Sequence, residues 1–192
     1  MNTSKPSFIV GIGGSAGALV AYEAFVEALP DDTGMAFVFV AHFLPTAHSQ
    51  LVAILSRRTN MTVAVASPAQ LKADRVYVCP PNADLTIADG AFRLVTPRTR
   101  NQQIDLFLTS LAEAMGPRAV GIIFSGYDGD GTEGCRQIKA KGGTTFAQDA
   151  SASVGNMPLS AQAAGCVDYV LPPEGIPAVL ARLAREREGK KR

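Results

Sequence analysis

Short, continuous apolar runs alternate with helix-forming segments along most of this 192-residue chain. Residues 8–12 and 35–41 are apolar throughout, which is typical of strands that are buried on both faces of a parallel sheet. A helical pattern follows each run, at 18–29 and at about 49–58. Parallel strands need long crossover connections, and helices are the usual form of those connections. The alternation therefore predicts an α/β fold with three layers and a doubly wound, mainly parallel sheet.

The second half of the chain repeats the alternation after one departure from it. In residues 84–95, two short predicted strands flank Asp89-Gly90. This pair readily supplies the two positive φ angles of a two-residue hairpin turn, so we expect a β-hairpin excursion from the sheet. The remaining expected strands are 75–79, 119–124, 144–147 and 167–171, and the remaining expected helices are 104–115, 132–141 and about 174–187.

Composition limits the function classes open to such a fold. The chain is 47% hydrophobic and 18% charged with a formal net charge of +1. It is therefore too apolar for disorder, and its charge gives no case for a nucleic-acid or membrane surface. Glycine, proline and polar residues interrupt the uncharged stretches, so we expect neither membrane insertion nor a signal peptide. We expect a single domain over residues 1–192, with its core at about 7–187.

Cysteine and acid spacing favour no metal site. Cys79, Cys135 and Cys166 are odd in number, far apart and without a C-x-x-C pair, which indicates reduced thiols and a cytoplasmic location. Residues 128–133 partly match a calcium-binding loop. They lack the acid or Asn at its fifth position, so we expect no calcium there.

The glycine-rich segment 11–17 satisfies two patterns at once. Read from Gly11, it is G-x-G-x-x-A, the dinucleotide-binding fingerprint. Read from Gly13, it is G-x-S-x-G, in which glycines flank an exposed nucleophilic serine at a sharp strand-to-helix turn. A dinucleotide site needs an acid at the end of the second strand, and His42 stands there instead. A glycine-rich turn without chemistry, or one that only binds phosphate, remains an open alternative.

Candidate catalytic residues follow three predicted strands. Ser15 lies just past the first strand, His42 just past the second, and Asp128 and Asp130 just past the strand at 119–124. The carboxyl ends of parallel strands meet at one edge of the sheet, which is what a Ser–His–Asp triad requires.

Each of these residues also has an ordinary structural interpretation. His42 suits a strand-end histidine, and the two aspartates suit a turn and a helix N-cap. His48, the other histidine of the chain, looks like a helix start. Spacing alone does not choose between Asp128 and Asp130.

Seven motifs in order make the chain resemble a known family. It resembles the catalytic domain of the chemotaxis protein-glutamate methylesterases of the CheB type, in the variety often fused to a methyltransferase. The resemblance runs from residue 8 to about 183, and the motifs are 10–17, 41–45, 77–85, 104–111, 125–132, 143–149 and 157–158.

The resemblance implies a serine esterase that removes methyl groups from receptor glutamates, with glutamine deamidation as a second reaction. Matched residue by residue, it places the nucleophile at Ser15, the general base at His42 and the carboxylate at Asp130. Backbone N–H groups of Ala16 and Tyr127 become candidates for the oxyanion hole. No metal or organic cofactor is needed for this chemistry.

The resemblance also sets expectations about partners. A methylated chemoreceptor-like protein is the implied substrate, and a fused or separate methyltransferase or regulatory domain is a further partner to consider. The receiver domain usual in the family is not expected within these residues, so either regulation comes from elsewhere or the chain is a piece of something larger. The alternative is a non-catalytic, partner-binding domain of the same fold.

Overall fold

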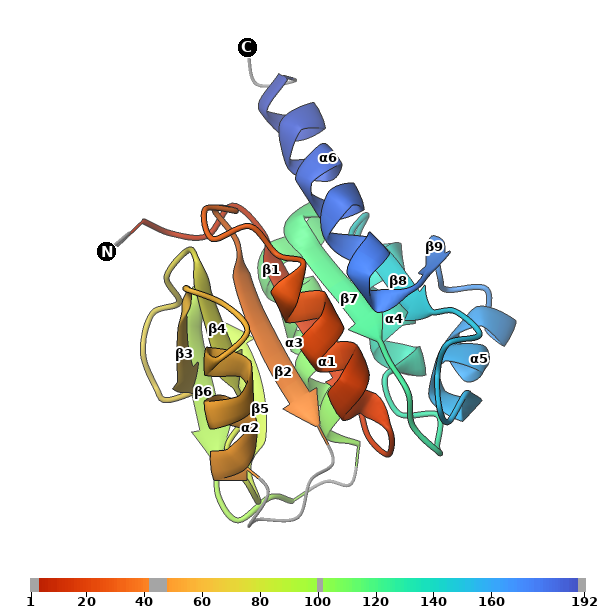
Figure 1. The fold of residues 1–192 in the computed structure, drawn as a ribbon. Coiled ribbons are helices and arrows are strands. Elements are labelled where there is room, and N and C mark those ends of the chain that lie inside the picture. Colours follow the sequence, from red (N-terminus) through yellow and green to blue (C-terminus); the bar gives the residue numbers. More distant parts are fainter. Residues whose placement is uncertain (1–3, 42–47, 100–101, 190–192) are drawn as a thin grey trace.

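Seven parallel strands form the central sheet of the computed structural model, which describes residues 4–41, 48–99 and 102–189 (Figure 1). The strands are β1 (Ile9–Gly14), β2 (Ala36–Ala41), β3 (Thr62–Val65), β4 (Arg75–Val78), β7 (Ala119–Ile123), β8 (Thr144–Gln148) and β9 (Tyr169–Leu171). Their order across the sheet is β3-β4-β2-β1-β7-β8-β9, and every neighbouring pair is parallel.

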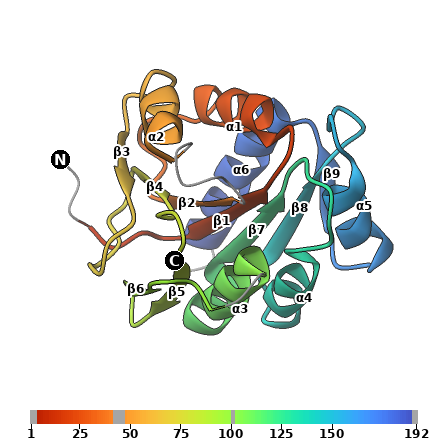
Figure 2. The same ribbon diagram turned by 90° about the horizontal axis from the view of Figure 1, so that it is seen from below.

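Helices cover both faces of this sheet. The helices are α1 (Ala18–Glu27), α2 (His48–Ser56), α3 (Gln103–Met115), α4 (Thr132–Ala140), α5 (Asn156–Ala163) and α6 (Ile176–Gly189). Figure 2 shows α1, α2 and α6 on one face, with α3 and α4 on the other. The predicted three-layer, doubly wound fold is therefore confirmed. No helix within the described ranges is both long and apolar enough to cross a membrane.

The two faces of the sheet bury different kinds of side chain. Under α1 the core is aromatic, and the rings of Phe25, Phe37 and Phe124 meet edge to face. Helix α1 presents buried residues at i, i+3, i+4, i+7 and i+8, which gives it one continuous apolar stripe. On the face under α3 and α4 the core is mostly aliphatic, with Leu108 and Ile138 fully buried.

The glycines of β1 allow helices to approach the strand closely on both faces. A Cβ on Gly13 would lie 2.4 Å from Ile104 Cγ2 of α3, and one on Gly14 would lie 2.5 Å from the hydroxyl oxygen of Tyr22 in α1. Gly11 has the same kind of close contact with α3. These glycines serve helix packing, and β1 runs to Gly14, two residues beyond its predicted end.

The predicted β-hairpin is confirmed as a separate two-stranded antiparallel sheet. It consists of β5 (Asp84–Ala88) and β6 (Ala91–Val95). Asp89 and Gly90 have φ angles of 54° and 73°, as the two-residue turn requires. The N–H of Ile87 donates to Ser110 Oγ at 3.1 Å, which ties the hairpin to α3.

The sequence patterns missed two elements, β3 and α5. Strand β3 is four residues long, lies at the sheet edge and is partly exposed, so it lacks the continuous apolar run of a buried strand. Helix α5 is eight residues long, with Pro158 in its first turn and only a small apolar face. Strand β9 begins at Tyr169 and not at the predicted 167.

Candidate active site

The segments after β1 and β7 diverge at the centre of the sheet. From β1 the chain crosses to β2 on one side, while β7 lies on the other side of β1 and leads on to β8. Ligands of open α/β sheets bind at such a switch point, outside the carboxyl ends of the strands. Gly13 of β1 and Gly131, which follows Asp130, both lie against Ile104 and Ile123. The loop that carries Asp130 is therefore packed beside the end of β1.

Ser15 sits in a turn between β1 and α1. Its N–H donates to the carbonyl of Ser125 at 2.8 Å, and its own carbonyl accepts the N–H of Ala18 at 3.1 Å. Gly17 precedes α1 with a φ angle of 75°, a left-handed conformation that favours glycine. The side chain of a half-buried serine thus stands at the N-terminal end of a helix, where the helix dipole favours negative charge.

Asp130 presents a buried carboxylate to the first turn of α3. Its residue surface is 4% exposed. Oδ2 accepts the N–H of Ile104 at 3.0 Å, and Oδ1 accepts the N–H of Asp105 at 2.8 Å. Two backbone donors at a helix N-terminus fix the orientation of the group. This is the kind of carboxylate that is able to orient an imidazole.

Asp128 has different surroundings, although it lies only two residues away. It is exposed, and its Oδ1 accepts the N–H of Asp130 at 3.1 Å within the same loop. That contact shapes the loop in the way that Asp commonly does in turns. Burial therefore separates two candidates that sequence spacing left equal.

Asp105 is a neighbour of the candidate site that sequence reasoning missed. Its Oδ1 accepts the N–H of Gly134 at 2.8 Å in the first turn of α4. The two helices are therefore linked in both directions. Asp130, just before α4, accepts N–H groups of the first turn of α3, and Asp105 of α3 accepts an N–H of the first turn of α4. The pKa of Asp105 is raised overall, mainly by burial. The Gly134 N–H lowers the pKa and the charge of Asp130 raises it. The signal that was available is an acid in the first helical turn.

Two backbone donors belong to segments next to Ser15. Among the described residues, the N–H groups of Ala16 and Tyr127 have no hydrogen-bond acceptor. Tyr127 follows Gly126, at which a Cβ would lie 3.1 Å from Ser15 Cβ. The Tyr127 residue is 70% exposed, so this loop presents an aromatic residue at the surface.

The two histidines differ in how far the structure describes them. His42 lies outside the described residues. The sheet register pairs Gly14 of β1 with Ala41 of β2, and these residues directly precede Ser15 and His42 in the chain. Helix α2 begins at His48, which agrees with the expected helix start.

The cysteines are poor candidates for nucleophiles. Cys79, Cys135 and Cys166 are all free and buried. Burial, with a smaller contribution from Asp84, raises the pKa of Cys79 to about 12. The thiolate is the reactive form, so such a thiol is inert near neutral pH. In the part of the chain that the structure describes, no group of three His, Cys, Asp or Glu residues is placed to hold a metal ion.

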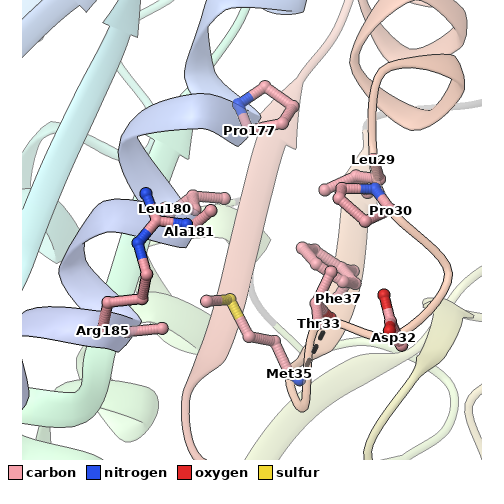
Figure 3. A pocket seen from close by; sticks show the side chains of 11 residues that line it. Leu29, Pro30, Asp32, Thr33, Met35, Phe37, Pro177, Leu180, Ala181 and Arg185 are labelled. Atoms are coloured by element: carbon pink, nitrogen blue, oxygen red, sulfur yellow. Dashed lines mark hydrogen bonds between the residues drawn. The ribbon is translucent and has the colours of Figure 1, made fainter. Parts of the chain in front are cut away.

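A pocket lies near the amino end of β2. It has a volume of about 300 Å³ and lies between the α1–β2 connection and α6 (Figure 3). Met35 and Phe37 contribute from the start of β2, and Leu180 contributes from α6. Since the candidate chemical groups follow the carboxyl ends of the strands, this pocket is separate from the candidate site.

Sequence comparison and structure comparison both find proteins of one family. A relative from Leptospira interrogans is 33% identical over 178 residues, which is 90% of this chain and 92% of the relative. Protein-glutamate methylesterase/protein-glutamine glutaminase 2 of Anaeromyxobacter dehalogenans is 34% identical over 182 residues. That alignment covers 92% of this chain and 53% of the relative, so the chain spans about half the length of this protein.

A solved structure agrees with the described fold. The catalytic domain of the Thermotoga maritima CheB methylesterase superposes with a TM-score of 0.85 at 29% sequence identity, over 92% of this chain and 98% of that one. The family described as CheB methylesterase matches residues 10–180. With its parallel sheet, its serine turn and its buried carboxylate, this chain belongs to the CheB methylesterase family.

Proposed function

We propose that this protein is a serine esterase that hydrolyses glutamate methyl esters on a chemoreceptor-like protein and releases methanol. Ser15 is the nucleophile, His42 the general base and Asp130 the orienting carboxylate. The observation that carries the proposal is that a serine at a helix N-terminus follows β1, while the loop packed beside the end of β1 carries a buried carboxylate that accepts two backbone N–H groups.

The proposed reaction follows the acyl-transfer scheme of serine hydrolases. Ser15 Oγ attacks the ester carbonyl while His42 takes its proton, and Asp130 stabilises the imidazolium. The oxyanion accepts hydrogen bonds from the N–H groups of Ala16 and Tyr127. His42 then protonates the departing methanol. Water attacks the acyl-enzyme by the same route and leaves a free glutamate.

Glutamine deamidation belongs to the same proposal. A side-chain amide follows the same path, with ammonia as the leaving group. The name of the Anaeromyxobacter dehalogenans relative joins the two activities.

The proposal treats residues 1–192 as one catalytic domain and places the reaction in the cytoplasm, where three free thiols are normal. A fused or separate methyltransferase or regulatory domain is part of the same hypothesis.

Covalent labelling tests the proposed nucleophile. A fluorophosphonate is expected to add once to the native protein, and peptide mass spectrometry is expected to locate the adduct on Ser15. The Ser15→Ala variant is expected to remain unlabelled at an unchanged melting temperature. Equal labelling of the variant would contradict the assignment. An unlabelled native protein that still binds a methylated receptor would favour the partner-binding alternative.

A further inference from the structure

A buried hydroxyl that the proposed reaction does not use lies directly behind the nucleophile turn. Ser125 is the second residue after β7, and its residue surface is 0% exposed. Its Oγ lies 2.7 Å from the carbonyl oxygen of Ala16 and 3.2 Å from that of Val154. It also accepts the N–H of Val154 at 2.9 Å. A hydroxyl has one proton, which the shorter contact assigns to Ala16.

Ser125 holds the turn at two points. Its backbone carbonyl accepts the N–H of Ser15 at 2.8 Å, while its hydroxyl donates to the carbonyl of Ala16. The backbone between these two fixed atoms includes the Cα that carries the Ser15 side chain and the N–H of Ala16. The two hydrogen bonds therefore bracket the proposed nucleophile together with one proposed oxyanion donor.

The same residue is fixed from behind. The N–H of Ser125 donates to Gln148 Oε1 at 3.0 Å, and Gln148 Nε2 donates to Ser151 Oγ at 3.1 Å. The next residue, Gly126, donates its N–H to the carbonyl of Val154 at 2.9 Å. The position of the Ser125 hydroxyl is thus set by β8 and by the loop between β8 and α5. These connections make it a rigid support and not an adaptable one.

We propose that the Ser125 hydroxyl is a positioning residue for acyl transfer, because it fixes the Ala16 backbone relative to Ser15. This inference rests on the proposed function, in which Ser15 is the nucleophile. Without the hydroxyl, the Ala16 carbonyl loses its hydrogen bond to Ser125, and the Ser15 N–H makes the one remaining hydrogen bond between the turn and Ser125. The position of the Ala16 N–H relative to the Ser15 side chain is then no longer fixed. The loss is expected in the chemical step and not in substrate binding.

Steady-state kinetics of Ser125→Ala on a methylated chemoreceptor test the proposal. A misplacement of about 1 Å in a catalytic group costs on the order of 100-fold, so we expect kcat to fall by about 10- to 100-fold. We expect KM to stay within about two-fold, since the substrate-binding surface is unchanged. The rate constant for fluorophosphonate labelling of Ser15 is expected to fall in parallel with kcat.

Ser110→Ala is the matched control. The Ser110 hydroxyl also donates to a carbonyl, that of Phe107 at 2.8 Å, and accepts one N–H, that of Ile87 at 3.1 Å. It lies between α3 and the hairpin, so its loss is expected to lower the melting temperature comparably while kcat stays near that of the wild type.

A second variant keeps the test decisive if Ser125→Ala does not fold. Ser125→Cys has a similar shape but only a weak donor, and it is expected to show the same loss of kcat. The proposal is overturned if Ser125 variants lose no more activity than Ser110→Ala. Failure of the proposed function gives a different result, namely full activity in Ser15→Ala.

Discussion

Asp128 and Asp130 show how strongly surroundings decide the use of a side chain. One is exposed and shapes its own loop, while the other is buried and accepts two N–H groups of α3. Glycine next to aspartate is a common turn signal, so residue type alone gave both positions the same interpretation. Burial and long-range contacts distinguish them, and the family resemblance pointed to the same residue.

Substitution of these two aspartates is expected to separate their roles. In Asp130→Asn the side chain keeps its size but loses the charge that stabilises an imidazolium, so kcat/KM is expected to fall by about 1,000-fold or more. Asp128→Asn retains an acceptor for the loop N–H and is expected to stay within about three-fold of the wild type. Ester hydrolysis measured for both variants checks the assignment, and equal losses would contradict it.

The two histidines give a second comparison at this scale. His42→Gln removes the proposed general base, so activity is expected to fall by about 1,000-fold or more. His48→Gln changes the first residue of α2 and is expected to leave kcat near the wild-type value. Kinetic constants of the two variants are the measurement. If His48→Gln lost most of its activity while His42→Gln stayed active, the general base would be His48 and not His42.

Among the elements, buried strands were the most predictable and peripheral ones the least. Strands β1, β2 and β7 are continuous apolar runs, and their position in the sheet placed Ser15 and the Asp130 loop at the same edge. The supporting contacts were not predictable in this way. Ser125 and Ala16 are 109 positions apart, and no local pattern shows that their atoms meet. Asp105 likewise meets Gly134 only because α3 packs on α4.

The packing of α3 on β1 depends on the absence of a Cβ at Gly13. In Gly13→Ala the new Cβ would lie 2.4 Å from Ile104 Cγ2, so the helix or the side chain must shift. Such overpacking is expected to lower the free energy of unfolding by about 1–3 kcal/mol. Gly175→Ala is the control, because its Cβ would lie 3.5 Å from Pro172 in ordinary contact. Urea denaturation compares the two, and equal stabilities would show that β1 tolerates the added methyl group.

At the scale of the whole molecule, one edge of the sheet depends on polar contacts. Strand β9 is three residues long and partly exposed, so it buries little apolar surface. Asp168 joins this edge to its neighbours: it accepts hydrogen bonds from Lys139 Nζ of α4 at 2.9 Å and from the Thr145 N–H at 3.0 Å. Partial burial raises the pKa of Asp168, but the hydrogen bonds from Lys139 and Thr145 outweigh it and lower the pKa overall.

The lowered pKa predicts how stability depends on pH. An unfolded Asp has a pKa of about 3.9, so the contribution of Asp168 is complete above that pH and is lost as the pH falls through the lower folded value. Asp168→Asn is expected to lower the free energy of unfolding by about 1–3 kcal/mol at pH 7. The difference from the wild type is expected to shrink as the pH falls below about 3.9.

Asp89→Asn is the control for this series, because the Asp89 side chain is 90% exposed and pairs with the exposed Arg93 on the surface. Thermal unfolding from pH 7 to pH 2.5 provides the comparison. A difference between Asp168→Asn and the wild type that is constant over this range would contradict the electrostatic explanation.

The central claim is that Ser15 carries out ester hydrolysis on a methylated receptor, and release of methanol measures that reaction directly. Wild-type protein incubated with a methylated chemoreceptor is expected to release methanol in proportion to the methyl groups lost. Ser15→Ala, folded to the same melting temperature, is expected to release none above the background. Equal release by the two proteins would contradict the account.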